Sequence, residues 1–178
     1  MTQRRLFLKR MTVLGAGIGS AWLGAAGPAR AAAATQPAVD LPAMPEQVEA
    51  LVLSAAEWRQ RLSPEQYRVL RERGTERPFS SPLDAETRAG DYVCSGCGLL
   101  LFRSEWKYDS GTGWPSFWEV VDAHVVRSVD FFLFYPRVAY DCARCGGHHG
   151  HVFEDGPADR TGLRYCNNGV SLVFRPRG

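Results

Sequence analysis

The spacing of apolar residues changes once along this chain, from a helical period to a strand-like one. Over residues 46–62, apolar side chains recur every three or four positions, which predicts an amphipathic helix. The positions are Val48, Leu51, Val52, Ala55, Trp58 and Leu62. A second helix is predicted to begin at Pro64, because Ser63 and Gln66 have the spacing of a capping box, and to stop at Gly74. A short helical part is therefore expected to precede the rest of the fold.

From residue 92 onward the apolar residues are mostly β-branched or aromatic, and they come in short runs separated by Gly, Pro and Asp. Runs of this kind predict short strands joined by tight turns. They cover residues 92–93, 99–102, 124–126, 129–135, 137–141, 151–153, 163–166 and 171–174. The predicted fold is mainly β, with short N-terminal helices and small antiparallel sheets.

Residues 1–31 are predicted to be an export signal rather than part of the fold. The letters RRLFLK at positions 4–9 resemble the twin-arginine export motif, a weakly apolar run follows, and Ala29-Arg30-Ala31 has the form of a cleavage signal. The alternative is a membrane anchor, but about a dozen apolar residues are too few to cross roughly 30 Å of hydrocarbon. We therefore expect the twin-arginine machinery to export the chain, to the periplasm or an equivalent space.

The rest of the sequence is expected to form one domain behind a tether. Residues 32–45 are rich in Ala and Pro and predict a flexible tether. Residues 46–178 are predicted to be a single domain, helical over 46–75 and β-rich over 90–178.

Charge argues against a nucleic-acid partner. The whole chain has 21 basic and 19 acidic residues, but five of the basic residues and none of the acidic ones lie in the export signal. Without that signal the chain has 16 basic and 19 acidic residues and a formal net charge of −3. No Lys/Arg stripe remains that would bind a phosphate backbone.

Four of the five cysteines form two C-x-x-C-G motifs, at 94–98 and 142–146. Two such pairs can hold a zinc ion in a tetrahedral four-thiolate site with Zn–S bonds of about 2.3 Å. The alternative is a redox C-x-x-C, but that motif normally occurs once and ahead of a helix. The predicted ligands of one structural Zn²⁺ per chain are Cys94, Cys97, Cys142 and Cys145. Because protein atoms fill all four positions, this metal is expected to stabilise the sheets rather than take part in chemistry.

The fifth cysteine, Cys166, has no partner in this count. A buried, inert thiol is one interpretation. Against it, an extended backbone would place Arg164, Cys166 and Asn168 on one face of a strand and Tyr165 on the other. A neighbouring guanidinium favours the thiolate, which is the nucleophilic form. We therefore interpret Cys166 as a candidate nucleophile.

A histidine cluster and an aromatic loop complete the candidate chemistry. Glycines around His148, His149 and His151 predict a tight turn after the second C-x-x-C motif, where an imidazole could donate a proton. A second metal site or solvated loop histidines are the alternatives.

The aromatic loop is the segment 110–118, for which core packing is the simplest explanation. Two glycines before Trp114 and a proline after it instead suggest a rigid loop that displays the indole. An indole face is a good surface for a methyl group on sulfur.

Together these segments closely resemble the methionine-(R)-sulfoxide reductase B family. Its motifs occur in order: G-W-P-S-F at 113–117, H-x-G-H-V-F-x-D-G-P at 148–157 and R-Y-C-x-N at 164–168. The resemblance runs from residue 62 to the end and implies a β-rich fold with zinc far from the reaction. It also implies the activity, that of an oxidoreductase that reduces methionine-(R)-sulfoxide to methionine.

The resemblance assigns a role to each matching position. Cys166 would attack the sulfoxide sulfur and become a sulfenic acid, while His151, helped by His148, would protonate the departing oxygen. The substrate would lie against Trp114 and Phe153. Asp155 and Asn168 would order hydrogen bonds, and Arg164 would favour the thiolate. The implied partners are oxidised methionine, in proteins or free, and a small-thiol or thioredoxin-like reductant; a monomer is expected.

The sequence departs from the family pattern at several positions. Thr112 occupies the place where many members have a resolving cysteine, and no sixth cysteine replaces it. His149 stands where leucine is common and Asn167 where an apolar residue is common, and residues 131–135 are unusually aromatic. These departures concern substrate preference and regeneration of the enzyme rather than the type of reaction.

Two other classes of function remain open from the sequence alone. A zinc-ribbon scaffold that only binds a ligand in a Trp-lined pocket would still work after alkylation of Cys166. A thiol–disulfide oxidoreductase would need a second cysteine close to Cys166, and its zinc content would fall to half or less.

Overall fold

The computed structural model describes residues 48–131 and 135–178. The predicted export signal (1–31), the tether (32–45) and the first two positions of the predicted first helix lie outside these residues. Within them, no helix is long and apolar enough to cross a membrane.

The first helix is shorter than the sequence predicts. Residues 48–54 are not helical, and α1 spans Ala55–Arg61. The reason is a capping box: the Ser54 hydroxyl accepts the Glu57 N–H, and the Glu57 carboxylate accepts the Ser54 N–H. The segment before this cap bonds elsewhere, because the Leu51 N–H donates to the Arg144 carbonyl at 2.7 Å. The predicted helix over 46–62 is therefore wrong in its first half.

The second helix, α2 (Pro64–Glu72), confirms the predicted start. Ser63 caps it in a box with Gln66, and Pro64 occupies the first turn. Its end differs by one residue, because Arg73 rather than Gly74 takes the left-handed conformation, with φ of 56°. The Gly74 N–H then donates to the Arg68 carbonyl at 2.9 Å, which closes the last turn.

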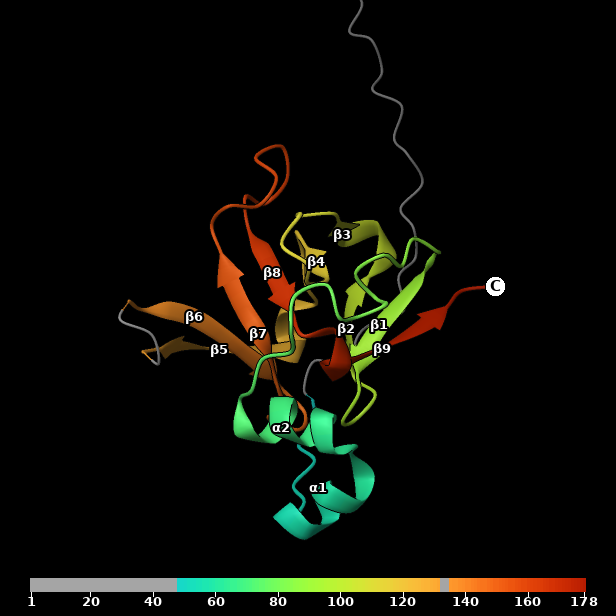
Figure 1. The fold of residues 1–178 in the computed structure, drawn as a ribbon, viewed down its shortest axis with the longest axis vertical. Helices are drawn as coiled ribbons and strands as arrows, with labels where there is room; N and C mark the ends of the chain where they lie inside the picture. The colour runs from blue at the N-terminus through green and yellow to red at the C-terminus, as the bar shows by residue number, and fades with distance from the viewer. Residues whose placement is uncertain (1–47, 132–134) are drawn as a thin grey trace, which may run out of the picture. The chain divides into compact units, whose positions relative to one another are not determined.

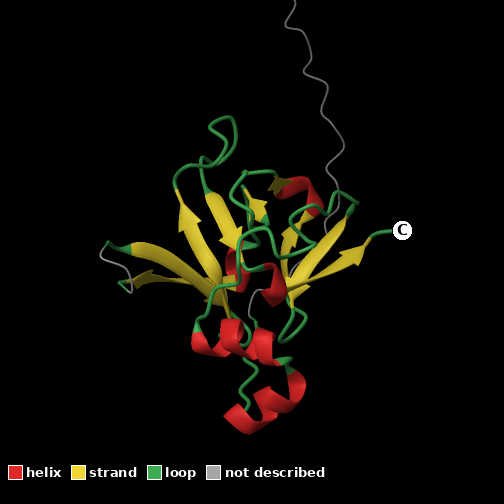
Figure 2. Cartoon of the chain, in the orientation of Figure 1, coloured by secondary structure: helices red, strands yellow, loops and turns green. Residues whose placement is uncertain are grey.

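The described strands form two antiparallel sheets, as the sequence predicts (Figures 1 and 2). The smaller sheet has the order β2 (Leu100–Arg103), β1 (Gly90–Cys94), β9 (Leu172–Pro176). The larger has the order β3 (Lys107–Tyr108), β4 (Ser116–Phe117), β8 (Arg164–Asn167), β7 (His148–Phe153), β6 (Arg137–Cys142), β5 (Val125–Asp130). Short 3₁₀ turns lie at Ser104–Trp106, Asp122–His124 and Gly169–Ser171.

The strand boundaries correct the sequence prediction in two places. Residues 125–126 and 129–130, from two separate predicted runs, belong to the single strand β5, which ends at Asp130. The histidine segment is also not a turn, because β7 begins at His148. Gly150 sits inside this strand because β7 and β8 approach closely there: a Cβ at this position would lie 1.9 Å from the Cys166 carbonyl oxygen.

An aromatic core joins the two sheets. Phe102 of β2 stacks on Phe117 of β4 with ring centroids 4.2 Å apart, and Tyr140 of β6 meets Tyr165 of β8 edge to face at 5.6 Å. These four side chains are almost fully buried. Because Tyr165 points into this core, its neighbour Cys166 points to the opposite face of β8, as the period-two pattern predicts.

Candidate active site and metal centre

The four cysteines of the two C-x-x-C-G motifs, the first knuckle at 94–98 and the second at 142–146, gather into one buried cluster. Their sulfur atoms all lie within 4.8 Å of one another, with Cys94 and Cys145 3.6 Å apart and Cys97 and Cys142 3.5 Å apart. A tetrahedral site with Zn–S bonds of about 2.3 Å requires sulfur atoms roughly 3.8 Å apart. The donor set and its spacing therefore fit a tetrahedral metal ion, and no open position is left for a substrate.

Each knuckle has the same local geometry. Gly98 and Gly146 take positive φ values of 77° and 66°, and each donates its N–H to the carbonyl of the first cysteine of its motif at 2.8 Å. Residues with a Cβ rarely adopt this conformation. The glycine that follows each C-x-x-C therefore turns the chain so that both thiols point to one centre.

The two helices hold the knuckles from outside. Arg61 of α1 donates to the Gly96 carbonyl and Arg71 of α2 to the Cys145 carbonyl, both at 2.7 Å. Leu70 of α2 packs so closely on the second knuckle that a Cβ at Gly147 would lie 2.8 Å from it. The helices, the cluster and both sheets are thus coupled, so loss of the metal is expected to affect the whole fold.

A separate hollow of about 120 Å³ collects most of the predicted reactive residues. Its walls are formed by Thr75, Trp114, Arg137, Gly150, His151, Phe153, Cys166, Asn167 and Asn168. None of the knuckle cysteines lines it. The hollow therefore brings together five of the predicted site residues and keeps them apart from the metal cluster.

Cys166 faces this hollow from β8, directly opposite His151 on β7 and Ser116 on β4. Burial raises the pKa of the Cys166 thiol, while Arg164 and a hydrogen bond with the Thr112 side chain oppose this shift without reversing it. The predicted effect of Arg164 on the thiol is thus present but smaller than the effect of burial. Burial thus favours the thiol form of Cys166 over the thiolate.

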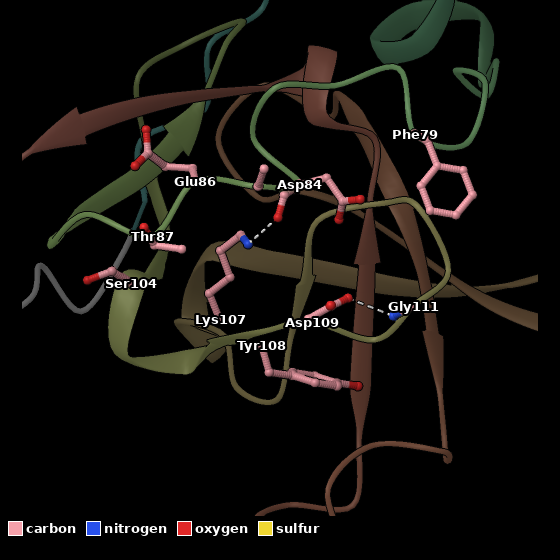
Figure 3. Close-up of a pocket in the computed structure, with 10 residues that line it drawn as sticks. Phe79, Asp84, Glu86, Thr87, Ser104, Lys107, Tyr108, Asp109 and Gly111 are labelled. Carbon is pink, nitrogen blue, oxygen red and sulfur yellow. Dashed lines mark hydrogen bonds between the residues drawn. The ribbon is translucent and has the colours of Figure 1, made fainter.

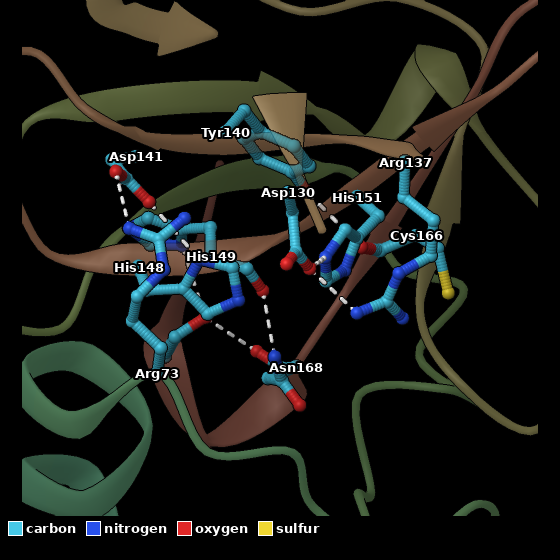
Figure 4. A network of polar contacts seen from close by, with 11 residues as sticks. Arg73, Asp130, Arg137, Tyr140, Asp141, His148, His149, His151, Cys166 and Asn168 are labelled. Atoms are coloured by element: carbon cyan, nitrogen blue, oxygen red, sulfur yellow. Dashed lines mark hydrogen bonds and ion pairs between the residues drawn. The ribbon is translucent and has the colours of Figure 1, made fainter. Parts of the chain in front are cut away.

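His151 is oriented by a carboxylate that the sequence analysis missed. Its Nε2 lies 2.7 Å from the Asp130 carboxylate, which also accepts a hydrogen bond from Arg137 at 2.6 Å (Figure 4). Burial lowers the pKa of His151, and the Asp130 contact only partly offsets this. The only sequence signal was that Asp130 and Arg137 flank the β5–β6 turn, where antiparallel pairing places them opposite each other.

His148 lies beside the hollow rather than in it. Its Nδ1 is 3.0 Å from the Asp141 carboxylate, which also binds Arg73 at 2.9 Å. Burial alone would raise the pKa of Asp141, but the contacts with His148 and Arg73 bring it below its usual value. The His148 and His151 rings meet edge to face with centroids 5.4 Å apart. Any effect of His148 on the hollow would therefore pass through His151.

Arg164 and Asp155 pair with each other instead of lining the hollow. Two parallel hydrogen bonds of 2.8 and 2.7 Å join the guanidinium to the carboxylate, which lowers the pKa of Asp155. The guanidinium also lies over the Phe153 ring, 4.5 Å from its centroid. The pair thus supports one wall of the hollow from behind.

This chain is similar to proteins of one known family. The SelR domain family model matches residues 62–176. The protein named peptide methionine sulfoxide reductase MsrB from Methanosarcina barkeri is 52% identical over 128 residues, covering 71% of this chain and 89% of its own length. The protein of the same name from Bradyrhizobium diazoefficiens is 51% identical, covering 71% and 91%. This chain belongs to the methionine-(R)-sulfoxide reductase B family. It is therefore an oxidoreductase, as the resemblance implies.

Three residues that depart from the MsrB pattern, Thr112, His149 and Asn167, lie close to Cys166 in the chain or in space. Thr112 lies close enough to Cys166 for its side chain to oppose the rise that burial causes in the pKa of the thiol. His149 and Asn167 are both buried. Burial lowers the pKa of His149 to about 4 and raises that of Tyr140, and the nearby Asn167 side chain partly opposes both shifts. Neither polar atom of the Asn167 side chain has a hydrogen bond of normal geometry. The two unusual polar residues thus form one buried cluster behind Cys166.

Two further surface features of this chain do not line the hollow of Cys166. Between β5 and β6, Phe131 and Tyr135 are 73% and 58% exposed. A wider hollow of about 560 Å³ includes Phe79, Gly111 and several acidic residues, and there Lys107 donates to the Asp84 carbonyl at 2.7 Å (Figure 3). None of the predicted site residues lines this second hollow.

Proposed function

We propose that this enzyme reduces methionine-(R)-sulfoxide, chiefly in proteins, through a sulfenic acid on Cys166. The thiolate attacks the sulfoxide sulfur and takes up the oxygen as a hydroxyl with one proton, so that the substrate leaves as methionine. The cysteine sulfur is oxidised by two electrons as the substrate sulfur is reduced by two. The observation that carries this proposal is the hollow in which Cys166, His151 and Trp114 face the same space.

The walls of the hollow support this assignment of the substrate. Trp114 and Phe153 offer aromatic surface, which contacts sulfur-bound methyl groups favourably. His151 and Asn168 offer polar groups on the same hollow. A small space of this kind suits the end of a methionine sulfoxide side chain better than a larger ligand. Substrates in proteins are proposed because that side chain can enter while its backbone stays outside.

Proton transfer is assigned to His151, with Asp130 fixing the ring. In the free protein a thiol and a neutral imidazole are expected, since burial raises the pKa of Cys166 and lowers that of His151. Moving one proton from sulfur to His151 creates both reactive forms, the nucleophile and the acid. The total number of protons on the two side chains stays the same in this transfer.

The rate is therefore expected to be independent of pH between these two pKa values, at least from pH 6.5 to 9.0. Below this range both groups bind a proton and the thiolate is lost, and above it both lose a proton and the acid is lost. The measurement is kcat/KM from single turnovers without reductant. In His151→Gln the rate should instead rise about tenfold per pH unit toward the Cys166 pKa. A wild-type rate that rises steadily across neutral pH would contradict the role of His151.

Regeneration is proposed to need an external thiol. None of the five cysteines forms a disulfide, the four other than Cys166 belong to the metal cluster, and Thr112 lies near Cys166 where a resolving cysteine could have been. The sulfenic acid thus has no free thiol in the chain with which to condense. We propose that a small thiol or a thioredoxin-like protein attacks Cys166 directly.

The test is one turnover with one equivalent of substrate and no reductant. We expect a sulfenic acid that dimedone traps, with no loss of two hydrogens in the non-reduced mass. Thr112→Cys, with Thr112→Ser as its matched control, should form a disulfide with Cys166 during turnover. A wild-type disulfide between Cys166 and a knuckle cysteine would show that the metal thiols take part and would overturn the proposal.

The metal is proposed to be one structural Zn²⁺ per chain, held by Cys94, Cys97, Cys142 and Cys145. A closed set of four thiolates favours zinc over Mg²⁺ or Ca²⁺, which prefer oxygen ligands. Metal analysis of the purified chain tests this assignment.

The enzyme is further proposed to act as a monomer exported by the twin-arginine route. The motif at 4–9 supports that route, which carries folded proteins, so the zinc site could be filled before export. Cell fractionation tests the location, and sedimentation tests the oligomeric state. Recovery of the chain only in the cytoplasm would contradict this part of the proposal.

A further inference from the structure

Glu76 is a buried acidic residue that the reaction itself does not use. It follows α2 and is only 4% exposed. Its carboxylate accepts two backbone N–H groups, from Gly169 at 2.6 Å and Val170 at 2.9 Å. These bonds join segments more than 90 residues apart in the sequence. The side chain thus fixes the loop after α2 against the turn that follows β8.

The backbone of Glu76 contacts two residues that line the hollow. Its N–H donates to the Asn168 side-chain oxygen at 3.0 Å, and its carbonyl accepts the Trp114 indole N–H at 3.3 Å. Thr75, the preceding residue, lines the hollow itself. One peptide segment therefore supports two different walls of the hollow.

The fit around this residue is tight. A Cβ at Gly169 would lie 1.9 Å from the Ser81 hydroxyl and 3.3 Å from the Glu76 carboxylate. Asn168 is also held from the other side, because its side-chain nitrogen donates to the His149 carbonyl at 2.9 Å (Figure 4). A small shift of Glu76 would therefore pass to Asn168 rather than be absorbed by empty space.

The Glu76 carboxyl group lies in an environment that disfavours its charged form. Burial raises the pKa of Glu76, the nearby acidic residues Glu65 and Asp84 raise it further, and the Gly169 and Val170 amides only partly oppose this. No ion pair of Glu76 with a basic side chain is found among the described residues. Glutamine would avoid the cost of burying a charge, but its NH₂ group would replace one of the two oxygens, each of which accepts a different N–H group.

We propose that Glu76 is a positioning residue, which sets the Trp114 indole and the Asn168 amide relative to Cys166 and thereby makes the hollow selective for a methyl sulfoxide. This inference rests on the proposed function. Glu76 does not touch the reacting atoms; it acts through the two residues that its backbone holds. Its carboxylate matters because it keeps that backbone in place.

The test compares Glu76→Gln with Glu65→Gln. Glu65 and Glu76 both line a surface hollow that is separate from the hollow of Cys166, so both changes remove one acidic group from the same place. Only Glu76→Gln also removes a carboxylate oxygen that accepts an N–H group of Gly169 or Val170. The substrates are the (R)-sulfoxides of one blocked amino acid, with an S-methyl and an S-ethyl group. Concentrations are corrected by titrating the active sites with a single turnover, so that misfolded protein does not count.

For Glu76→Gln we expect KM for the methyl sulfoxide to rise about tenfold, as the loss of one charge-assisted hydrogen bond implies. The preference for methyl over ethyl should fall by a similar factor, and Glu65→Gln should behave as the wild type. A merely structural role would lower the number of active sites but leave KM and the preference unchanged. That outcome in Glu76→Gln would overturn the inference.

A second variant covers the case in which Glu76→Gln does not fold. Trp114→Phe keeps an aromatic face but removes the N–H that binds the Glu76 carbonyl, and it should reduce the methyl preference in the same way. An unchanged preference in Trp114→Phe would also overturn the inference. If the wild type reduces neither sulfoxide, the proposed function itself fails, which is a distinct result.

Discussion

Cys166→Ser should abolish sulfoxide reduction while leaving the metal cluster and the fold intact. The loss is expected to exceed about a thousandfold, because removal of a covalent nucleophile costs at least several kcal/mol of transition-state stabilisation. A serine hydroxyl at this position would not ionise near neutral pH, and the neighbouring Arg164 is already paired with Asp155. The measurement is methionine released in a single turnover from the separated R diastereomer.

The control for this variant is its metal content, since nucleophile and metal use different sulfur atoms. We expect one metal ion per chain and unchanged circular dichroism. Residual activity above about a thousandth of the wild-type rate would mean that Cys166 is not the nucleophile. Full function after alkylation of Cys166 would instead favour a binding scaffold.

Cys94→Ser or Cys145→Ser should lose the metal and, with it, the folded state. Binding of a structural zinc can contribute on the order of 10 kcal/mol, which is as large as the whole stability of a typical domain. Here the cluster also anchors both helices, through Arg61 to the first knuckle and Arg71 to the second. Metal analysis and thermal unfolding of the same sample measure both effects.

Ser95→Ala is the matched control for the knuckle variants. Ser95 lies within the first knuckle but is not a ligand, and its hydroxyl makes one hydrogen bond, to the Val170 carbonyl at 3.2 Å. Its replacement should cost about 1 kcal/mol and leave the metal bound. A cysteine variant that stayed folded and active without metal would show that the cluster is not structural.

The features that the sequence predicted well are local ones. The capping boxes at Ser54 and Ser63 depend on residues three positions apart, although only the second was used to place a helix start. The knuckles depend on a spacing of three and on glycine at positive φ. The orientation of Cys166 toward the hollow follows from the alternation of β8, while its role as nucleophile, inferred from the cysteine count, stays a prediction. In each case the physical requirement is met by neighbours in the chain, so the sequence shows it directly.

The errors of the sequence prediction arose where local and distant interactions compete. The first helix was placed too early because apolar spacing continues through 48–54, while Leu51 actually donates to Arg144, far along the chain. The histidine segment was interpreted as a turn because of its glycines, but Gly150 is needed for the close approach of β8. Periodicity and composition do not report either contact.

By itself, then, the sequence determined the mainly β class, the four knuckle cysteines and the candidate nucleophile, and its motifs indicated the family that the comparison confirmed. Only the tertiary structure decided how the site is oriented. Asp130 reaches His151 across 21 positions and Glu76 reaches Gly169 across 93, and the net rise in the pKa of Cys166 follows from its burial. These are properties of distance and dielectric environment, which depend on how the sheets and loops pack and leave no periodic trace in the chain.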